Sequence, residues 1–566
     1  MIQGGHFVAK VLKSEGVTHL FTLCGGHIQA IYDGCLTEGI AVIDTRHEQS
    51  AAHAADGYAR VTGRVGVCAV TAGPGVTDAV TAVANAWRAN IPMICIGGAG
   101  PTVFRDMGSL QDMNHVELMR PITKWSVSVT ETRRIGEYMT AAFRKAISGV
   151  PGPVFIELPL DTLMEYIDES QYPIPANSRS EAKPAPDAVS LAQAVELLKS
   201  AERPVAIVGS QIRWSKDPEE TLTRFLDTLQ IPTFVNGMAR GLVDPEGAHF
   251  FNRSRKLALA KADVLLICGT PFDFRLSYGV ASPIQGGSQS GTMGTMLLNL
   301  TAPVMSADTR VIQVDLDPSE IGRNRGVDVG LYADTGLALS ALAEAIGAPQ
   351  PAWTEWKAKV RANEEKKRAE MIPELTAETN PPNPLRLCAE VNRFLRPGDI
   401  VVGDGGDFVA TAAYTLKVKG VATWMDPGPL GTLGVGPGYA MAAKLCRPDA
   451  RVVLMLGDGS FGLNGMEFEA MARQGIPVVG VVGNDACWTQ IFRGQVEIYG
   501  EQRAVATRLD YTHYEKVVEA LGGHGEYVER VEDIGPALER AFASGKPALV
   551  NVKIAGSDFR KGALSV

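Results

Sequence analysis

The sequence lacks the features of secreted, membrane-spanning and nucleic-acid-binding proteins. Its 566 residues include only eight cysteines, without paired or metal-type spacing, which excludes a disulfide framework and favours free thiols in a reducing cytosol. No long apolar run could span a bilayer, and residues 1–10 contain no cationic segment followed by an apolar stretch. The net charge of −9 argues against a nucleic-acid surface. We therefore expect a cytoplasmic protein with no membrane or nucleic-acid partner.

The chain instead shows a repeated alternation of short apolar segments and helical segments. Near the N-terminus, apolar segments such as 65–70 and 92–96 alternate with alanine-rich segments such as 49–62 and 76–89. This alternation predicts a parallel sheet with helices on both faces. The proline-rich residues 172–187 are typical of a linker.

The same alternation resumes twice, so we predict an α/β fold of three consecutive doubly wound parallel-sheet domains. The predicted domains cover residues 1–172, 188–348 and 380–566. A charged segment over residues 353–372 predicts a solvated connecting helix between the second and third domains. Residues 282–299, which are rich in Gly, Ser, Thr and Met, predict a mobile surface loop.

Two aspartates in the third domain each follow a predicted strand. The strand over residues 452–456 ends at the turn that contains Asp458, and a helix is predicted over residues 464–474. The next strand, over residues 477–482, ends at Asp485. In such a βαβ unit both side chains lie at the carboxyl edge of the sheet, where hard oxygen ligands suit Mg²⁺ or Ca²⁺. Aspartates that only cap turns are the alternative.

Several further segments complete a family pattern. They are Gly25-Gly26-His27-Ile28, Asp44-Thr45-Arg46-His47-Glu48, Thr71-Ala72-Gly73-Pro74-Gly75, Asp404-Gly405-Gly406-Asp407-Phe408, Gly431-Thr432-Leu433-Gly434-Val435-Gly436 and Asp558-Phe559-Arg560. With the aspartate pair, they resemble the thiamin diphosphate enzymes of the acetolactate-synthase-like superfamily. Within it the chain is most similar to 2-hydroxyacyl-CoA lyases of the acetolactate-synthase-like type, and next to benzaldehyde lyase.

The resemblance implies thiamin diphosphate and Mg²⁺ as cofactors. Asp458, Asp485 and the backbone carbonyl of Cys487 would bind the metal, although the family usually has Asn where this chain has Asp485. A shifted turn in which Asn484 supplies the ligand is the alternative. The implied cofactor-binding residues are Gly73, Gly405, Gly406, Asp407, Gly431, Leu433, Gly459 and Ser460. The middle domain of relatives holds ADP, FAD or no nucleotide, and the sequence does not choose among them.

The resemblance also implies catalytic residues. Glu48 would protonate the aminopyrimidine ring of the cofactor, although a carboxylate at the start of a helix can also be purely structural. His27 and Gln111 would contact the substrate oxygen. Tentative substrate contacts are Trp488, Ile491, Arg560 and Lys561, the last two in a C-terminal tail suited to coenzyme A phosphates.

The implied reaction is the cleavage of a 2-hydroxyacyl-CoA into an aldehyde or ketone and formyl-CoA, with ligation in reverse. Acetolactate-synthase or benzaldehyde-lyase carboligation is the alternative, and a non-catalytic binding protein with this fold is a third reading. The family builds its sites between subunits, so the resemblance implies a homodimer or homotetramer.

Overall fold

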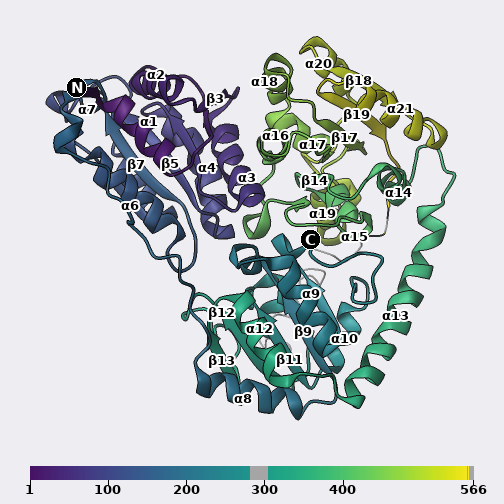
Figure 1. Cartoon of the computed structure of the whole chain (residues 1–566). Helices are drawn as coiled ribbons and strands as arrows, with labels where there is room; N and C mark the ends of the chain where they lie inside the picture. The colour runs from purple at the N-terminus through teal and green to yellow at the C-terminus, as the bar shows by residue number, and fades with distance from the viewer. Residues whose placement is uncertain (281–303, 558, 560–566) are drawn as a thin grey trace.

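The computed structural model describes residues 1–280, 304–557 and 559. It contains three parallel sheets, each with helices on both faces, which confirms the predicted fold class (Figure 1). The predicted loop over residues 282–299 and the tail residues Asp558, Arg560 and Lys561 lie outside the described residues.

The first sheet has the strand order β3-β2-β4-β5-β7-β6. Its strands are β2 (His19–Thr22), β3 (Ala41–Asp44), β4 (Gly66–Val70), β5 (Met93–Ala99), β6 (Trp125–Ser128) and β7 (Val154–Pro159). Strands β4, β5 and β7 are buried along their whole length, as expected for central strands of a parallel sheet. The helices are α1 (Gly4–Ser14), α2 (Gln29–Glu38), α3 (Glu48–Thr62), α4 (Pro74–Ala89), α5 (His115–Met119), α6 (Ile135–Ile147) and α7 (Leu160–Met164).

The middle sheet has the strand order β10-β9-β11-β12-β13. Its strands are β9 (Pro204–Val208), β10 (Thr233–Val235), β11 (Val264–Cys268), β12 (Arg310–Asp315) and β13 (Val329–Tyr332), and its helices include α8 (Ala188–Lys199), α9 (Pro218–Leu229), α10 (Arg255–Lys261) and α12 (Thr335–Ile346). The connecting helix α13 (Pro351–Leu375) is longer than predicted. It is also less solvated, because Trp353 and Trp356 are buried against the middle domain.

The third sheet has the strand order β15-β14-β16-β17-β19-β18. Its strands are β14 (Ile400–Gly403), β15 (Trp424–Met425), β16 (Val452–Gly457), β17 (Val479–Asn484), β18 (His524–Val528) and β19 (Ala548–Lys553). The helices are α14 (Pro384–Phe394), α15 (Asp407–Thr415), α16 (Gly436–Cys446), α17 (Asp458–Asn464), α18 (Glu467–Gln474), α19 (Thr489–Tyr499), α20 (Tyr514–Ala520) and α21 (Val531–Ala543). If the strands of each of these two sheets are numbered in chain order, the third sheet has the same strand order as the first sheet.

The helix predicted over residues 464–474 is wrong in its start. Two helices occupy this region, α17 beginning at Asp458 itself and α18 ending at residue 474, and they are separated at Gly465. A Cβ atom built on Gly465 would lie 2.7 Å from the ring of Phe461, so a residue with a larger side chain would clash with the last turn of α17. Hydrophobic periodicity alone did not reveal this break.

Helices α3 and α16 join the first and third domains within one chain. A Cβ atom on Gly57 would lie 2.9 Å from the Cα of Tyr439, so the two helices approach closely. Buried residues of both domains form one hydrophobic cluster. At its centre the buried Asp56 carboxylate accepts from Arg60 at 2.6 Å and from the Tyr439 hydroxyl at 2.7 Å. The two domains therefore share a core.

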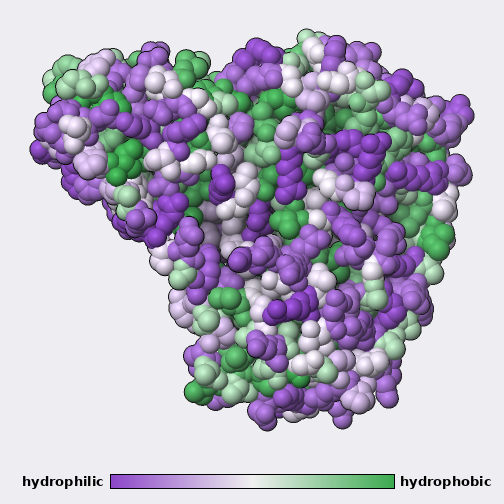
Figure 2. All heavy atoms as spheres, in the orientation of Figure 1, coloured by the Kyte–Doolittle hydropathy of each residue, from purple (hydrophilic) through white to green (hydrophobic). Residues whose placement is uncertain are grey.

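No helix among residues 1–280, 304–557 and 559 is long and apolar enough to cross a membrane. On the face shown in Figure 2, hydrophobic residues form small groups between hydrophilic ones.

Candidate active site

At the carboxyl edge of the third sheet, Asp404 ties two glycine-rich turns together. It follows β14, is fully buried, and accepts from the backbone N–H of Gly434 at 2.6 Å and of Gly436 at 3.0 Å. Burial raises the pKa of Asp404 to about 6. A Cβ atom on Gly405 would lie 2.3 Å from Leu433, so only glycine lets that half-buried leucine lie against the first turn. Asp404 is part of one of the sequence motifs, but the sequence alone indicated no role for it.

Asp458 and the turn after β17 are directly connected. Asp458, the first residue of α17, is 3 % exposed. One of its carboxylate oxygens accepts from Gly459 N–H at 2.9 Å and the other from Cys487 N–H at 3.2 Å. Asp485 accepts from the Thr489 hydroxyl. The structure thus brings the two predicted metal-binding turns together.

The chemistry of these carboxylates fits a divalent cation. Burial raises the pKa of Asp458 to about 6. The pKa of Asp485 rises to about 7, first through burial and then through the negative charges of Asp458 and Asp407. Because these carboxylates repel one another in a partly desolvated place, a bound Mg²⁺ would relieve the repulsion. The side chain of Asp407 itself forms a bidentate ion pair with Arg493, at 3.0 Å for both contacts.

The other predicted residues of this half lie around the same turns. The ring of Trp488 covers Gly459, where a Cβ atom would lie 2.6 Å from it. Ser460 is buried, Gly431 is exposed, and Ile491 on α19 is 57 % exposed. Trp488 is therefore packed on the turn, whereas Ile491 faces solvent in the single chain.

Three predicted residues gather at the carboxyl edge of the first sheet. His27 follows β2, and its Nδ1 lies 3.0 Å from the hydroxyl of Thr71, which follows β4. A Cβ atom on Gly73 would lie 2.8 Å from the Cβ of Gln111, so these two residues touch. Burial lowers the pKa of His27. The lowered pKa favours the neutral form of His27, and a neutral imidazole can accept a proton.

Glu48 lies at the same edge, as the first residue of α3. Its carboxylate is 8 % exposed, and burial is the main cause that raises its pKa, with a smaller contribution from Asp78. A ring nitrogen of His47 and one carboxylate oxygen each from Glu48 and Asp78 lie within 4.8 Å of one another. This environment favours a protonated carboxyl group, as an acid that donates to a ring nitrogen requires.

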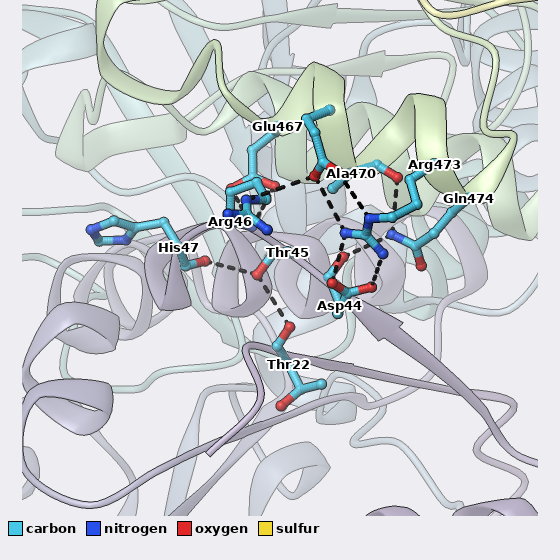
Figure 3. Close-up of polar contacts among 10 residues, drawn as sticks. Thr22, Asp44, Thr45, Arg46, His47, Glu467, Ala470, Arg473 and Gln474 are labelled. Carbon is cyan, nitrogen blue, oxygen red and sulfur yellow. Dashed lines mark hydrogen bonds and ion pairs between the residues drawn. The ribbon is translucent and has the colours of Figure 1, made fainter. Parts of the chain in front are cut away.

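The turn before Glu48 is held by the third domain of the same chain (Figure 3). The Glu467 carboxylate accepts from Arg46 N–H at 3.0 and 3.1 Å. Arg473 pairs with Asp44 at 2.8 and 2.9 Å. Glu467 is 1 % exposed, and burial raises its pKa to about 7. The sequence reasoning missed Glu467; the available signal was an acid on the apolar face of a helix, one turn before Met471.

The cavity lined by the third-domain residues of the predicted site does not reach its first-domain residues among the described parts of the chain. Gly405, Gly406 and Gly431 line a cavity of about 1500 Å³. Among the described residues, its lining includes none of His27, Glu48 and Gln111. The cavity extends instead from the third domain toward the middle domain, and its first-domain wall comes from other residues, such as Arg60, Trp87 and Lys124.

The middle-domain part of this cavity is polar and cationic. Asp315, which ends β12, accepts from Gln211 at 2.7 Å. Its other oxygen, both amide atoms of Asn236 and the Thr270 hydroxyl are buried without a hydrogen-bond partner among the described residues. The middle-domain arginines along the lining are Arg240, Arg253, Arg255, Arg275 and Arg323. Such unsatisfied buried atoms at strand ends are typical of a ligand site.

Comparison with known proteins identifies the family. Three domain families of thiamine pyrophosphate enzymes match: the N-terminal TPP binding domain over residues 2–118, the central domain over 191–342 and the C-terminal TPP binding domain over 404–552. A probable acetolactate synthase of Mycobacterium bovis is 38% identical, over 97% of this chain and 95% of that protein. The 2-hydroxyacyl-CoA lyase 2 of Homo sapiens is 37% identical, over 100% of this chain and 92% of that protein. That of Danio rerio is also 37% identical, over 100% and 93%.

These matches confirm the resemblance drawn from the sequence motifs. The chain belongs to the thiamine-pyrophosphate-dependent enzymes, in the family that contains acetolactate synthase and 2-hydroxyacyl-CoA lyase.

Proposed function

We propose that the chain is a carbon–carbon lyase that cleaves a 2-hydroxyacyl-CoA into an aldehyde or ketone and formyl-CoA, and catalyses the ligation in reverse. The observation that supports this substrate most is the cavity of about 1500 Å³ that begins at Gly405 and Gly406 and continues past several arginines. A coenzyme A thioester is long and carries phosphates, which arginine side chains bind well. A small acid such as pyruvate needs no such extension.

Thiamin diphosphate and Mg²⁺ are the proposed cofactors. Asp458, Asp485 and the Cys487 carbonyl would bind the metal, and backbone N–H groups near Gly405, Gly406, Gly459 and Ser460 would approach the diphosphate. When bound, the cofactor supplies a thiazolium carbon that accepts the electron pair of the broken carbon–carbon bond. Leu433 would support the bent cofactor between its rings, beside Gly431, and Gly73 would contact the aminopyrimidine.

The catalytic groups proposed for this chain act on protons. Glu48 would hold a proton at the N1′ atom of the aminopyrimidine, which its raised pKa permits. His27 would accept the proton of the substrate hydroxyl, and Gln111 would hydrogen-bond to the same oxygen without changing its charge. Trp488 and Ile491 would line the substrate side of the site.

The separation of the two half-sites supports a site between subunits. The first-domain residues Val103, Phe104, Met107 and Leu110 are each at least half exposed, as are Leu463, Met466 and Ile491 of the third domain. Apolar groups of this size are usually covered in an assembly. We propose a homodimer or a homotetramer, in which the first domain of one subunit faces the third domain of its partner.

The C-terminal tail is the proposed clamp on coenzyme A. Phe559 packs edge-on against Tyr414 with ring centroids 6.3 Å apart, and Arg253 of the middle domain lies 5.1 Å from the Phe559 ring centroid. The tail thus begins at the wall of the cavity. Arg560 and Lys561 follow directly in the sequence and would reach the coenzyme A phosphates.

ADP or FAD is the alternative occupant of the middle-domain part of the cavity, in place of coenzyme A, and an enzyme with no nucleotide there is the third possibility. The unsatisfied atoms of Asp315, Asn236 and Thr270 support a polar ligand there. Absorbance of the purified protein at about 450 nm would identify FAD, and chromatography of the denatured supernatant would identify ADP.

A cytoplasmic location is part of the same proposal. All eight cysteines are free thiols, and burial raises the pKa of Cys35 and of Cys388 to about 12, which keeps them unreactive. This pattern suits a reducing compartment.

The test of the reaction is a direct comparison of donors. Purified enzyme with thiamin diphosphate and Mg²⁺ is assayed with a 2-hydroxyacyl-CoA, with pyruvate and with benzoin. A kcat/KM for the thioester at least tenfold above the other two supports the proposal. Pyruvate as the best donor supports acetolactate synthesis, the second candidate, which the Mycobacterium bovis relative favours. Absence of hydrogen–deuterium exchange at the thiazolium carbon of the bound cofactor would instead indicate a non-catalytic binding protein.

A further inference from the structure

A buried histidine–glutamate pair lies behind the turn that carries Gly73. His115, the first residue of α5, is fully buried, and Glu157 in β7 is 7 % exposed. His115 Nδ1 lies 2.8 Å from a carboxylate oxygen of Glu157, and Gly73 N–H donates to His115 Nε2 at 2.8 Å.

These two contacts define which ring nitrogen carries the proton. A backbone N–H can only donate, so Nε2 of His115 must present its lone pair to Gly73. The ring proton therefore resides on Nδ1 and is donated to Glu157. A neutral imidazole thus links a carboxylate on β7 to the backbone that follows β4.

The Gly73 turn is closely packed against Gln111. Both residues have positive φ angles, 58° for Gly73 and 62° for Gln111. A Cβ atom on Gly73 would lie 2.9 Å from the Gln111 carbonyl oxygen and 3.0 Å from its Cα. The Gly73 backbone therefore lies directly against Gln111, and a shift of Gly73 toward it would displace Gln111. Within the single chain, the neighbouring side chains of Leu110 and Met113 pack little, since they are 79 % and 40 % exposed.

We propose that His115 and Glu157 are positioning residues that fix the Gly73 turn and, through it, the side chain of Gln111. The inference rests on the proposed function for the roles of Gly73 and Gln111. A polar contact misplaced by about 1 Å at the reacting oxygen costs on the order of 10²-fold in rate. Loss of the pair should therefore lower kcat by roughly 10- to 100-fold, with a smaller change in KM.

The informative substitution is His115→Gln. A glutamine amide can accept from Gly73 N–H through its oxygen and donate to Glu157 through its nitrogen, so it can replace both hydrogen bonds. His115→Ala removes both. Met119→Ala is the control, because Met119 is buried one turn later on α5 but makes neither contact. The measurements are kcat, KM and amide hydrogen exchange of Gly73 in the substrate-free enzyme.

We expect His115→Ala to speed the exchange of the Gly73 amide and to lower kcat, and His115→Gln to restore both to within about fivefold of wild type. Met119→Ala should lower the melting temperature and leave the exchange of Gly73 unchanged. Unchanged kcat and exchange in His115→Ala, or a His115→Gln enzyme as impaired as His115→Ala, would overturn the proposal. If the wild-type enzyme turns over none of the three donors, the proposed function fails, and the exchange of Gly73 alone decides whether the pair holds the turn.

Discussion

Glu48 is a carboxyl group whose surroundings favour its protonated form. Burial is the main cause that raises its pKa, and the nearby Asp78 adds to it. Glu48→Gln keeps the size of the side chain and removes its exchangeable acid. We expect kcat to fall by roughly 10²–10⁴-fold while the fold and thiamin diphosphate binding persist. Steady-state kinetics and cofactor titration check this, and activity within about threefold of wild type would contradict the role.

The ionisation of Asp485 should make both stability and metal binding depend on pH. In the protein without metal its pKa is raised to about 7 by burial and by Asp458 and Asp407. A raised carboxyl pKa stabilises the fold at pH values below the ordinary pKa, and that stabilisation is lost as the pH rises through 7. Mg²⁺ requires the ionised form, so its apparent affinity should rise with pH, by up to about tenfold per unit below pH 7.

The matched variants are Asp485→Asn and Asp458→Ala. Asp485→Asn should still bind cofactor, because Asn is the family residue at this position, and its Mg²⁺ affinity should depend less steeply on pH. Asp458→Ala should lose thiamin diphosphate and activity together. Loss of cofactor binding in Asp485→Asn would show that a different residue, such as Asn484, supplies the ligand.

The alternation of strands and helices was enough to predict that the turns of Asp458 and Asp485 lie at one edge of the third sheet. Asp458 and Asp485 follow strands that are neighbours in the sheet, so their approach followed from the βαβ rule. The contact between Arg46 and Glu467 joins residues 421 positions apart and depends on how two domains pack. Local periodicity carries no information about such a pair. The His115–Glu157 contact lies within the first domain, but it joins residues 42 positions apart, so local periodicity did not reveal it either.

The buried carboxylate of Glu467 on α18 should contribute more to stability than the exposed ion pair of Arg473 on the same helix. Glu467→Ala would remove a buried side chain and leave the Arg46 N–H without its acceptor at a partly buried position, which costs about 1–3 kcal/mol. Arg473→Ala removes the exposed ion pair with Asp44 from the same helix, which is worth only about 0–1 kcal/mol. Urea unfolding should therefore rank Glu467→Ala as the less stable variant. The reverse order would mean that the ion pair, and not the buried carboxylate, holds the turn before Glu48.

Mixed dimers of two inactive variants should show whether one chain supplies both Glu48 and Asp458 to an active site or whether two chains share them. Glu48→Gln and Asp458→Ala each inactivate a homodimer. If the sites lie between subunits, a mixed dimer has one site with both changes and one with neither, so random mixing should restore about a quarter of the wild-type activity. Sites within single chains would give no recovery, because each chain would keep its own defect. Unfolding and refolding the mixed variants together, followed by an activity assay, distinguishes these outcomes.

The identical strand order of the first and third sheets has an evolutionary consequence. Equivalent strands end at paired site residues: β4 leads to Gly73 where β16 leads to Asp458, and β5 leads toward Gln111 where β17 leads to Asp485. An internal duplication of one ancestral sheet is the simplest origin of this correspondence. If the proposed function holds, one copy then diverged to bind phosphate and metal, and the other to bind the organic base. Each half would then have kept the ancestral carboxyl edge as its binding surface.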